Sequence, residues 1–137
     1  MTIRFLQEAL ELAQQGEGKV SPNPAVGAVV VQDDVVVGRG VHTWAGIKHA
    51  EVLALEQAGE RARGGTLYVT LEPCSHEGRT PPCVEAILAA GIRRVWVGQR
   101  DPNPRVAGGG LSRLRRAGLS LQVGVLEPEC REQHRGF

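Results

Sequence analysis

The chain has 137 residues, enough for one compact domain of the usual ~100–200 residues but not for two. Apolar residues make up 42% of it and charged residues 23%, as in globular proteins, so neither a disordered chain nor a fibre fits. Sixteen basic against fifteen acidic residues leave a net charge of +1, whereas a protein that binds nucleic acid through its phosphates carries a larger basic surplus.

The first part of the chain predicts an amphipathic helix followed by a β-hairpin. Apolar residues recur at helical spacing from Phe5 to Ala13, and Gly16 follows where such a helix ends. Two β-branched runs, Gly27–Val31 and Val35–Val41, flank three polar residues, which is a hairpin signal. We therefore expect these two strands to pair antiparallel.

The rest of the chain alternates helices and strands, which predicts crossover connections and a largely parallel sheet beyond the hairpin. The expected elements are a helix from about Ala50 to Ala62, a strand Thr66–Thr70, a helix Cys83–Ala90, a strand Arg94–Val97, a helix Leu111–Ala117, a strand Leu119–Val123 and a last helix Glu127–His134. Residues 1–137 thus predict a single domain of the α/β class, with three layers and a mixed sheet of about five strands.

Unusual polar clusters adjoin the strands of this sheet. Sheets of this type collect functional groups at the carboxyl ends of their strands. The clusters are Ser21–Pro24 before the first strand, Val41–Trp44 after the second, Leu71–Pro82 after the third and Gly98–Arg105 after the fourth. The sequence therefore predicts one site assembled from four loops.

Four side chains in and beside these loops suit a catalytic zinc ion. One imidazole, from His49, and two thiolates, from Cys74 and Cys83, are ligands that tetrahedral Zn²⁺ accepts, and three protein ligands leave a fourth position open for water. Cys83 follows two prolines at a helix start, where the helix dipole favours the thiolate. Glu51, two residues after His49, is placed to move protons without being a ligand.

A structural zinc and a thiol nucleophile are the alternative interpretations of the same residues. In the second, Cys74 would attack a substrate with a histidine as its base. Two neighbouring cysteines, and the lack of an Asn or Asp near the histidine to orient it, make that mechanism weaker. Measuring the zinc content separates the catalytic-zinc mechanism from the thiol mechanism.

The loop between the two cysteines points to a known family. H-x-E followed by P-C and a second cysteine is the signature of zinc-dependent base deaminases, although here eight residues rather than two separate the cysteines. Pro73–Cys83 (PCSHEGRTPPC) resembles the motif P-C-S-H-x-G-[RK]-T-P-P-C of the deaminase domain of the bifunctional riboflavin-biosynthesis protein, diaminohydroxyphosphoribosylaminopyrimidine deaminase. The resemblance extends to Ser21–Gly27 (SPNPAVG), His49–Val52 (HAEV) and Asp101–Gly108 (DPNPRVAG).

The resemblance implies a cytidine deaminase-like fold and one reaction. In that reaction the 2-amino group of 2,5-diamino-6-ribosylamino-4(3H)-pyrimidinone 5′-phosphate is replaced by oxygen, which gives the pyrimidinedione nucleotide and ammonia. It also implies one Zn²⁺ per chain, with His49, Cys74 and Cys83 as ligands and Glu51 as the catalytic proton shuttle. The substrate contacts implied in the same way are Asn23, His42, His76, Arg79, Asp101 and Asn103.

The chemistry of three of these side chains agrees with such roles. Asn23 can hydrogen-bond the pyrimidine edge, Arg79 can bind the phosphate through two N–H groups, and Asp101 can pair with ribose hydroxyls. The alternatives are structural: turns at the Asn-Pro and Asp-Pro sequences, a strand-end role for His42, and a solvated loop charge at Arg79.

Three other functions stay open. A deaminase of another free base or nucleoside, of the cytosine or guanine type, would use the same chemistry, but the long loop between the cysteines argues against it. A nucleic-acid deaminase is disfavoured by the near-neutral charge and by the small number of aromatic residues, two Trp, one Tyr and two Phe. From a different class, a non-catalytic module would only hold zinc or a nucleotide, and the presence of Glu51 disfavours it.

Composition and resemblance also predict the compartment and the partners. No apolar run approaches the ~20 residues of a membrane span, Met1–Ala13 interleaves charges as no signal peptide does, and three cysteines are too few for a disulfide framework. We therefore expect a cytoplasmic protein without nucleic-acid or membrane partners, in which Cys130 is inert. By analogy with the family the chain forms homo-oligomers. Because relatives continue into a reductase domain, we expect this chain to be either a stand-alone deaminase or an excised domain, with the reductase step supplied elsewhere.

Overall fold

The computed structural model describes residues 3–16, 26–41, 50–71, 83–99 and 109–124. Within these residues, no helix is both long and apolar enough to cross a membrane. The elements, in chain order, are α1 (Ile3–Gly16), β1 (Gly27–Gln32), β2 (Val35–Val41), α2 (Ala50–Ala58), the 3₁₀ helix η2 (Gly59–Ala62), β3 (Thr66–Leu71), α3 (Cys83–Ala89), β4 (Arg94–Gln99), α4 (Gly109–Arg116) and β5 (Ser120–Val123).

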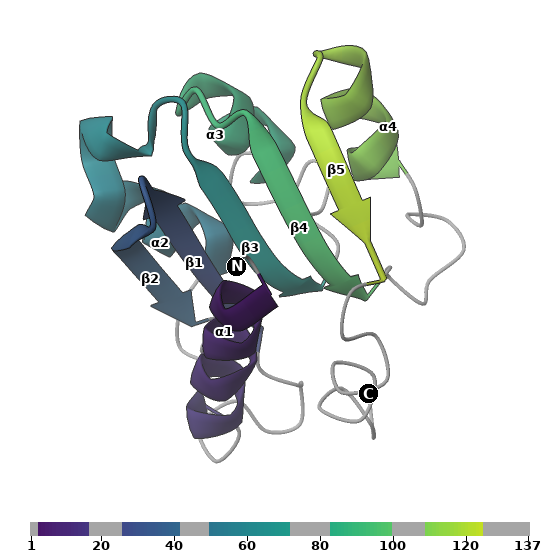
Figure 1. Cartoon of the computed structure of the whole chain (residues 1–137). Helices are drawn as coiled ribbons and strands as arrows, with labels where there is room; N and C mark the ends of the chain where they lie inside the picture. The colour runs from purple at the N-terminus through teal and green to yellow at the C-terminus, as the bar shows by residue number, and fades with distance from the viewer. Residues whose placement is uncertain (1–2, 17–25, 42–49, 72–82, 100–108, 125–137) are drawn as a thin grey trace.

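The strands form one five-stranded sheet in the order β2-β1-β3-β4-β5 (Figure 1). β1 pairs antiparallel with both β2 and β3. The pairs β3–β4 and β4–β5 are parallel. The predicted mixed α/β sheet, with an antiparallel hairpin and parallel strands beyond it, is confirmed.

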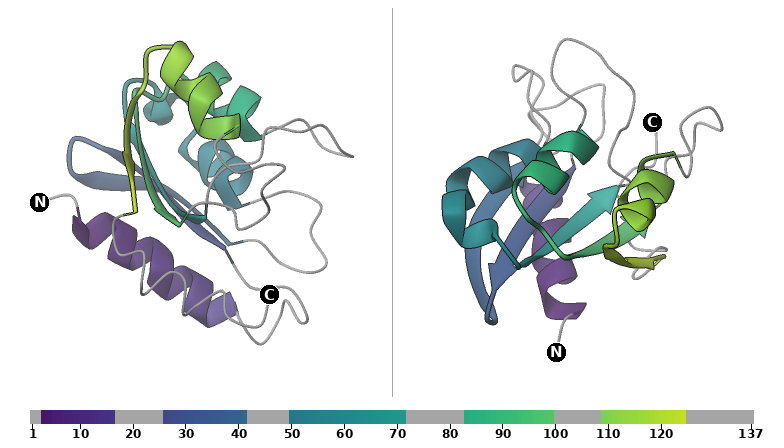
Figure 2. Two further views of the ribbon diagram at one scale, coloured as in Figure 1. Left: turned by 90° about the vertical axis from the view of Figure 1, so that its right-hand side faces the viewer. Right: turned by 90° about the horizontal axis from the view of Figure 1, so that it is seen from above.

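Helices cover both faces of this sheet, as Figure 2 shows: α1 lies on one face, and α2, α3 and α4 lie on the other. The larger core cluster lies between the sheet and α2, α3 and α4, with Val30, Val69 and Val95 among its fully buried members. The smaller cluster, under α1, contains Phe5, Leu6, Ala9, Val29, Val31 and Tyr68. Strand residues of alternating position thus face the two clusters, which is the pattern of a sheet between two helical layers.

Three helices begin or end at other residues than predicted: α2, α4 and α3, which ends at Ala89 instead of Ala90. The predicted helix from Ala50 to Ala62 is interrupted, because α2 ends at Ala58 and Gly59 adopts a φ of 59°. A glycine in this left-handed conformation ends an α-helix, and the chain continues as the 3₁₀ helix η2. Further along, α4 begins at Gly109 rather than Leu111 and ends at Arg116 rather than Ala117, so its first two residues are glycines.

Four strands also differ slightly from the prediction: β1 and β3 each extend one residue further, to Gln32 and Leu71. β4 extends to Gln99, two residues beyond the predicted end, because Gln99 pairs with Leu71 of β3. β5 begins at Ser120, one residue later than predicted. The last predicted helix, Glu127–His134, lies outside the described residues.

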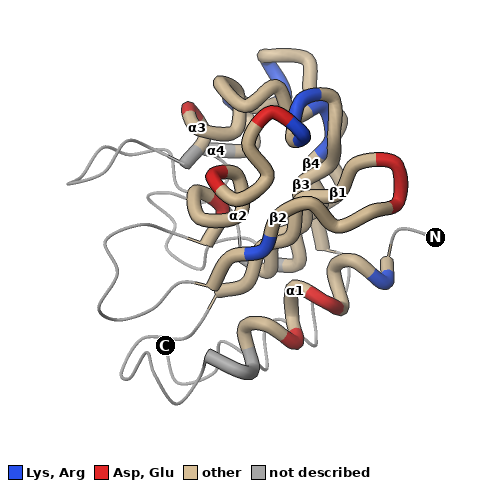
Figure 3. Tube along the Cα trace, turned by 90° about the vertical axis from the view of Figure 1, so that its left-hand side faces the viewer, with Lys and Arg blue, Asp and Glu red and all other residues tan. Residues whose placement is uncertain are grey.

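The β1–β2 hairpin closes through two aspartates. Gln32 pairs with Val35, which places Gln32 in β1 and leaves only Asp33 and Asp34 in the turn. Their φ angles are 51° and 63°, and positive φ at both central residues is the mark of a type I′ turn. The turn is the acidic tip, drawn in red, of the hairpin in Figure 3.

Candidate active site

One edge of the sheet gathers the residues that adjoin all four predicted loops. Gly27, at the start of β1, pairs with Val41, at the end of β2. Its N–H donates a hydrogen bond to the Oγ1 atom of Thr70, near the end of β3, with an N···O distance of 3.2 Å. Leu71, the last residue of β3, pairs with Gln99, the last of β4. The four loops therefore begin or end at one edge, as a single site requires.

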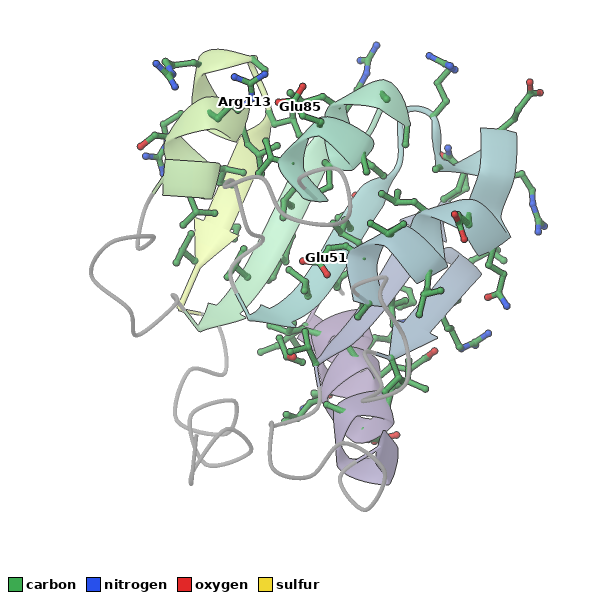
Figure 4. All side chains as sticks on the ribbon, turned by 180° about the vertical axis from the view of Figure 1, so that it is seen from behind. Glu51, Glu85 and Arg113 are labelled. Carbon is green, nitrogen blue, oxygen red and sulfur yellow. The ribbon has the colours of Figure 1, made fainter. Side chains whose placement is uncertain are left out.

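Glu51 is the second residue of α2 and is buried, with an exposed fraction of 3%. In Figure 4 its carboxylate lies over the sheet beside the start of α2 and not on the outer surface of the helix. Only one other polar or charged residue of the described part of the chain, Thr70, is buried to this degree. Burying a carboxylate costs free energy that hydrogen bonds or an opposite charge must offset, so such a residue is rare in a core. Its position suits a group that transfers protons within a site shielded from bulk water.

The start of α2 is fixed by direct backbone contact with β2. A Cβ atom added at Gly40 would lie 2.2 Å from the carbonyl oxygen of Ala50, and one added at Gly38 would lie 2.1 Å from that of Ala54. No side chain other than hydrogen fits between the strand and the helix there. Glycine within a strand signals such a close approach, so the Gly-Arg-Gly sequence of β2 was a signal that our sequence analysis did not use.

Cys83 is the first residue of α3, as predicted. Free N–H groups and the dipole at a helix start favour a thiolate there. α3 contacts α2 through the core and is joined to α4 by an ion pair between Glu85 and Arg113, both labelled in Figure 4. The helix that begins with Cys83 is therefore fixed beside the helix that carries Glu51.

The other predicted site residues lie outside the described residues. Among the residues that are described, no three His, Cys, Asp or Glu side chains form a group able to hold a metal ion. His49 directly precedes α2, and Cys74 follows the end of β3 in the next loop. The predicted site residues in question are Asn23, His42, His49, Cys74, His76, Arg79, Asp101 and Asn103, together with the side chain of Cys83.

Thr70 is a residue of this edge that the sequence analysis missed. It is completely buried, and its side chain is hydrogen-bonded to Gly27, 43 residues away in the sequence. A threonine near the end of the predicted strand, shortly before a loop that carries residue types able to bind zinc, was the available signal. Its partner could not be named from the sequence, because it depends on how β1 and β3 pair.

Comparison with known proteins agrees with this arrangement. The family model described as "Cytidine and deoxycytidylate deaminase zinc-binding region" matches residues 1–99. The chain is 55% identical to the riboflavin biosynthesis protein RibD of Synechocystis over 132 residues, which are 96% of this chain and 36% of that protein. It is 46% identical to the diaminohydroxyphosphoribosylamino-pyrimidine deaminase of Buchnera aphidicola (from Acyrthosiphon pisum) over 135 residues, 98% of this chain and 92% of that protein.

A solved structure shows the same fold. The diaminohydroxyphosphoribosylaminopyrimidine deaminase/5-amino-6-(5-phosphoribosylamino)uracil reductase of Thermotoga maritima is 48% identical, with a TM-score of 0.89 over 96% of this chain and 38% of that one. The chain thus spans little more than a third of the Synechocystis and Thermotoga proteins, but nearly all of the Buchnera deaminase. It therefore belongs to the family of zinc-binding cytidine and deoxycytidylate deaminases and, within it, to the diaminohydroxyphosphoribosylaminopyrimidine deaminases.

Proposed function

We propose that this chain hydrolytically deaminates 2,5-diamino-6-ribosylamino-4(3H)-pyrimidinone 5′-phosphate in riboflavin biosynthesis, giving the 5-amino-6-ribosylamino-pyrimidinedione 5′-phosphate and ammonia. The observation that carries the proposal is the buried Glu51 at the start of α2, beside the sheet edge where the four loops begin or end. Similarity to the Buchnera deaminase over nearly the whole length of both chains supports the same substrate.

The proposed cofactor is one Zn²⁺ per chain, held by His49, Cys74 and Cys83. One imidazole and two thiolates form a donor set that suits zinc, and the place of Cys83 at the first residue of α3 favours its thiolate form. When bound, the ion supplies Lewis acidity that lets water attack at neutral pH. The description of the matching family as a zinc-binding region supports the metal.

Glu51 moves the protons of the proposed reaction. Its carboxylate takes a proton from the attacking water and delivers it to the neighbouring ring nitrogen. It then takes the remaining proton from the hydroxyl now on the ring carbon and passes it to the departing amine, because an amide-like anion is a very poor leaving group. A C–O bond forms at the ring carbon, the C–N bond breaks, and ammonia leaves. Burial of Glu51 keeps bulk water from exchanging with these protons.

Six residues of the loops are the proposed substrate contacts. Asn23 hydrogen-bonds the edge of the pyrimidine, Arg79 binds the 5′-phosphate through two parallel N–H groups, and Asp101 accepts hydrogen bonds from the ribose. These three roles divide the substrate into base, phosphate and sugar. The three further contacts proposed are His42, His76 and Asn103.

A substrate panel tests this function. Zinc-loaded protein is supplied with the diaminopyrimidine nucleotide, deoxycytidylate, cytosine or guanine, and ammonia release is measured. We expect a kcat/KM for the diaminopyrimidine nucleotide that exceeds the others by about 10³-fold or more, because unpaired polar groups penalise wrong substrates. Faster turnover of any other compound in the panel contradicts the proposed substrate. Tight binding of the nucleotide without ammonia release shows a non-catalytic module instead.

The proposed partners follow from the same function. The small pyrimidine nucleotide is the ligand, and a net charge of +1 gives no support to a nucleic-acid partner. The product is passed to a reductase, which the dual name of the Thermotoga protein supports. Residues 1–137 act as one deaminase domain that forms homo-oligomers, and the need to keep the two ligand cysteines reduced supports a cytoplasmic location.

A further inference from the structure

The hydrogen bond from Gly27 to Thr70 joins the two strands next to the site. Thr70 is fully buried, and its Oγ1 accepts the Gly27 N–H at 3.2 Å. The backbone pairing of β1 with β3 runs as far as Ala28 with Val69. At the next position along both strands, the hydroxyl of Thr70 takes the place of a backbone acceptor.

Helix α1 also confines Gly27, from the face of the sheet that it covers. A Cβ atom there would lie 1.9 Å from the carbonyl oxygen of Ala9, so the helix rests directly on the backbone of β1. Contact with α1 prevents Gly27 from moving out of the sheet toward that helix, and the hydrogen bond to Thr70 fixes it against β3. The point at which the chain enters β1 is therefore held by both an adjoining helix and an adjoining strand.

Both residues stand four positions from a proposed site residue. Asn23, the proposed contact of the pyrimidine edge, lies four residues before Gly27, and the proposed ligand Cys74 lies four residues after Thr70. We propose that Thr70 is a positioning residue for substrate binding: its hydrogen bond fixes the start of β1, which Asn23 precedes in the sequence, against the end of β3. This inference rests on the proposed function.

The hydrogen bond is separate from the helices that carry Glu51 and Cys83. Thr70 is two residues from Tyr68 on the same strand, so both face the α1 side of the sheet. α2 and α3 pack on the opposite side. Loss of the Thr70 hydroxyl thus acts on the start of β1, beside the proposed contact Asn23 in the sequence, more than on the proposed proton shuttle. Its effect should fall on KM.

The variant Thr70→Val tests this, because valine keeps the branched shape of threonine but cannot accept the hydrogen bond. We expect KM for the diaminopyrimidine nucleotide to rise about tenfold, the effect of ~1.4 kcal/mol, while kcat stays within about twofold and zinc content is unchanged. Thr70→Ser keeps an acceptor and should restore KM. Thr66→Val, at the opposite end of the same strand, is the matched control and should leave KM unchanged.

An unchanged KM in Thr70→Val overturns the inference, and so does an equal fall in kcat or a loss of zinc, each of which shows a general structural role. If the wild-type chain does not turn the nucleotide over, the proposed function fails on its own. In that case, and if Thr70→Val does not fold, hydrogen exchange of wild-type protein still tests the contact. A Gly27 amide that exchanges as fast as an unstructured one overturns the inference.

Discussion

The backbone of Gly40 in β2 touches that of Ala50 at the start of α2: a Cβ at Gly40 would lie only 2.2 Å from the Ala50 carbonyl oxygen. Ala50 is flanked by His49, a proposed zinc ligand, and by Glu51, the proposed proton shuttle. The strand surface thus sets the height at which the first turn of α2 stands above the sheet. Contacts of this kind transmit small shifts, because packed interiors deform little.

Gly40→Ala should therefore reduce activity as well as stability. Forcing a methyl group into a packed contact costs about 1–3 kcal/mol of unfolding free energy, and the helix must move to accept it. Gly38→Ala is the matched control, because it meets Ala54 one turn further along α2. Urea unfolding and kcat of folded, zinc-loaded protein should show similar losses of stability but a larger fall in kcat for Gly40→Ala. Equal falls in kcat would show that the first turn of α2 is not specially sensitive.

The turn of the β1–β2 hairpin should become more stable when Asp34 is replaced by glycine. Asp34 has a φ of 63°, and a side chain in this region costs roughly 1 kcal/mol that glycine avoids. Asp34→Ala removes the same carboxylate but keeps a Cβ, so Asp34→Gly should exceed it in unfolding free energy by about this amount. The turn is at the far end of β1 from Gly27, so kcat should not change. Equal stability of the two variants would contradict a strained turn.

Tyr68 should ionise only at unusually high pH. Its ring is buried between those of Phe5 and Trp96, with centroid distances of 5.4 Å and 5.7 Å. Burial first, and the charge of Asp34 second, raise the pKa of Tyr68, although Arg94 and Arg4 oppose the shift. Because the chain has one tyrosine, the ultraviolet absorbance of tyrosinate measures this group alone.

The sign of this shift also sets a limit on alkaline stability. A raised folded-state pKa means that folding favours the neutral phenol. The contribution of Tyr68 to the free energy of unfolding is therefore complete below the unfolded pKa of about 10, and it is lost as the pH rises through the folded-state pKa. Asp34→Asn should lower the pKa of Tyr68 relative to wild type, whereas Asp33→Asn is the control. A wild-type titration midpoint at or below 10 would contradict the burial of Tyr68.

Cys83→Ser should lose zinc, whereas Cys130→Ser should retain it. A serine hydroxyl remains protonated at neutral pH and is a poor zinc ligand, and Cys83 is the only one of the two that lies at a proposed ligand position. Metal analysis of the two purified variants gives the comparison directly. One zinc per chain in Cys83→Ser would remove Cys83 from the ligand set.

The fold was largely predictable, because the apolar pattern of each element agrees with its final burial. The run at Phe5, Ala9 and Ala13 faces the sheet, and the β-branched run of β1 is buried on both faces. The end of α2 was missed because it depends on the positive φ of Gly59, which the helical pattern through Ala62 conceals. The end of β4 was missed because Gln99 is held in the strand by its pairing with Leu71 of β3, not by its own strand propensity.

Less of the candidate site was predictable. The places of Glu51 and Cys83 at helix starts were predicted from the sequence, and the structure has both, whereas the burial of Glu51 was not predicted. The contacts of Gly40 with Ala50, and of Thr70 with Gly27, join segments that are far apart in the chain. Such contacts depend on strand order and on the height of a helix above the sheet, neither of which the local sequence specifies.

The most direct test of the central claim compares Glu51→Gln with wild type in ammonia release from the diaminopyrimidine nucleotide, at equal zinc content. Glutamine has nearly the same shape but cannot carry the proton. The matched control is Glu56→Gln, the same change on the exposed side of α2. The account predicts that Glu51→Gln keeps one zinc per chain and loses about 10³-fold or more in kcat, while Glu56→Gln keeps its activity. Glu51→Gln protein that retains zinc and turns over within about tenfold of wild type would contradict it.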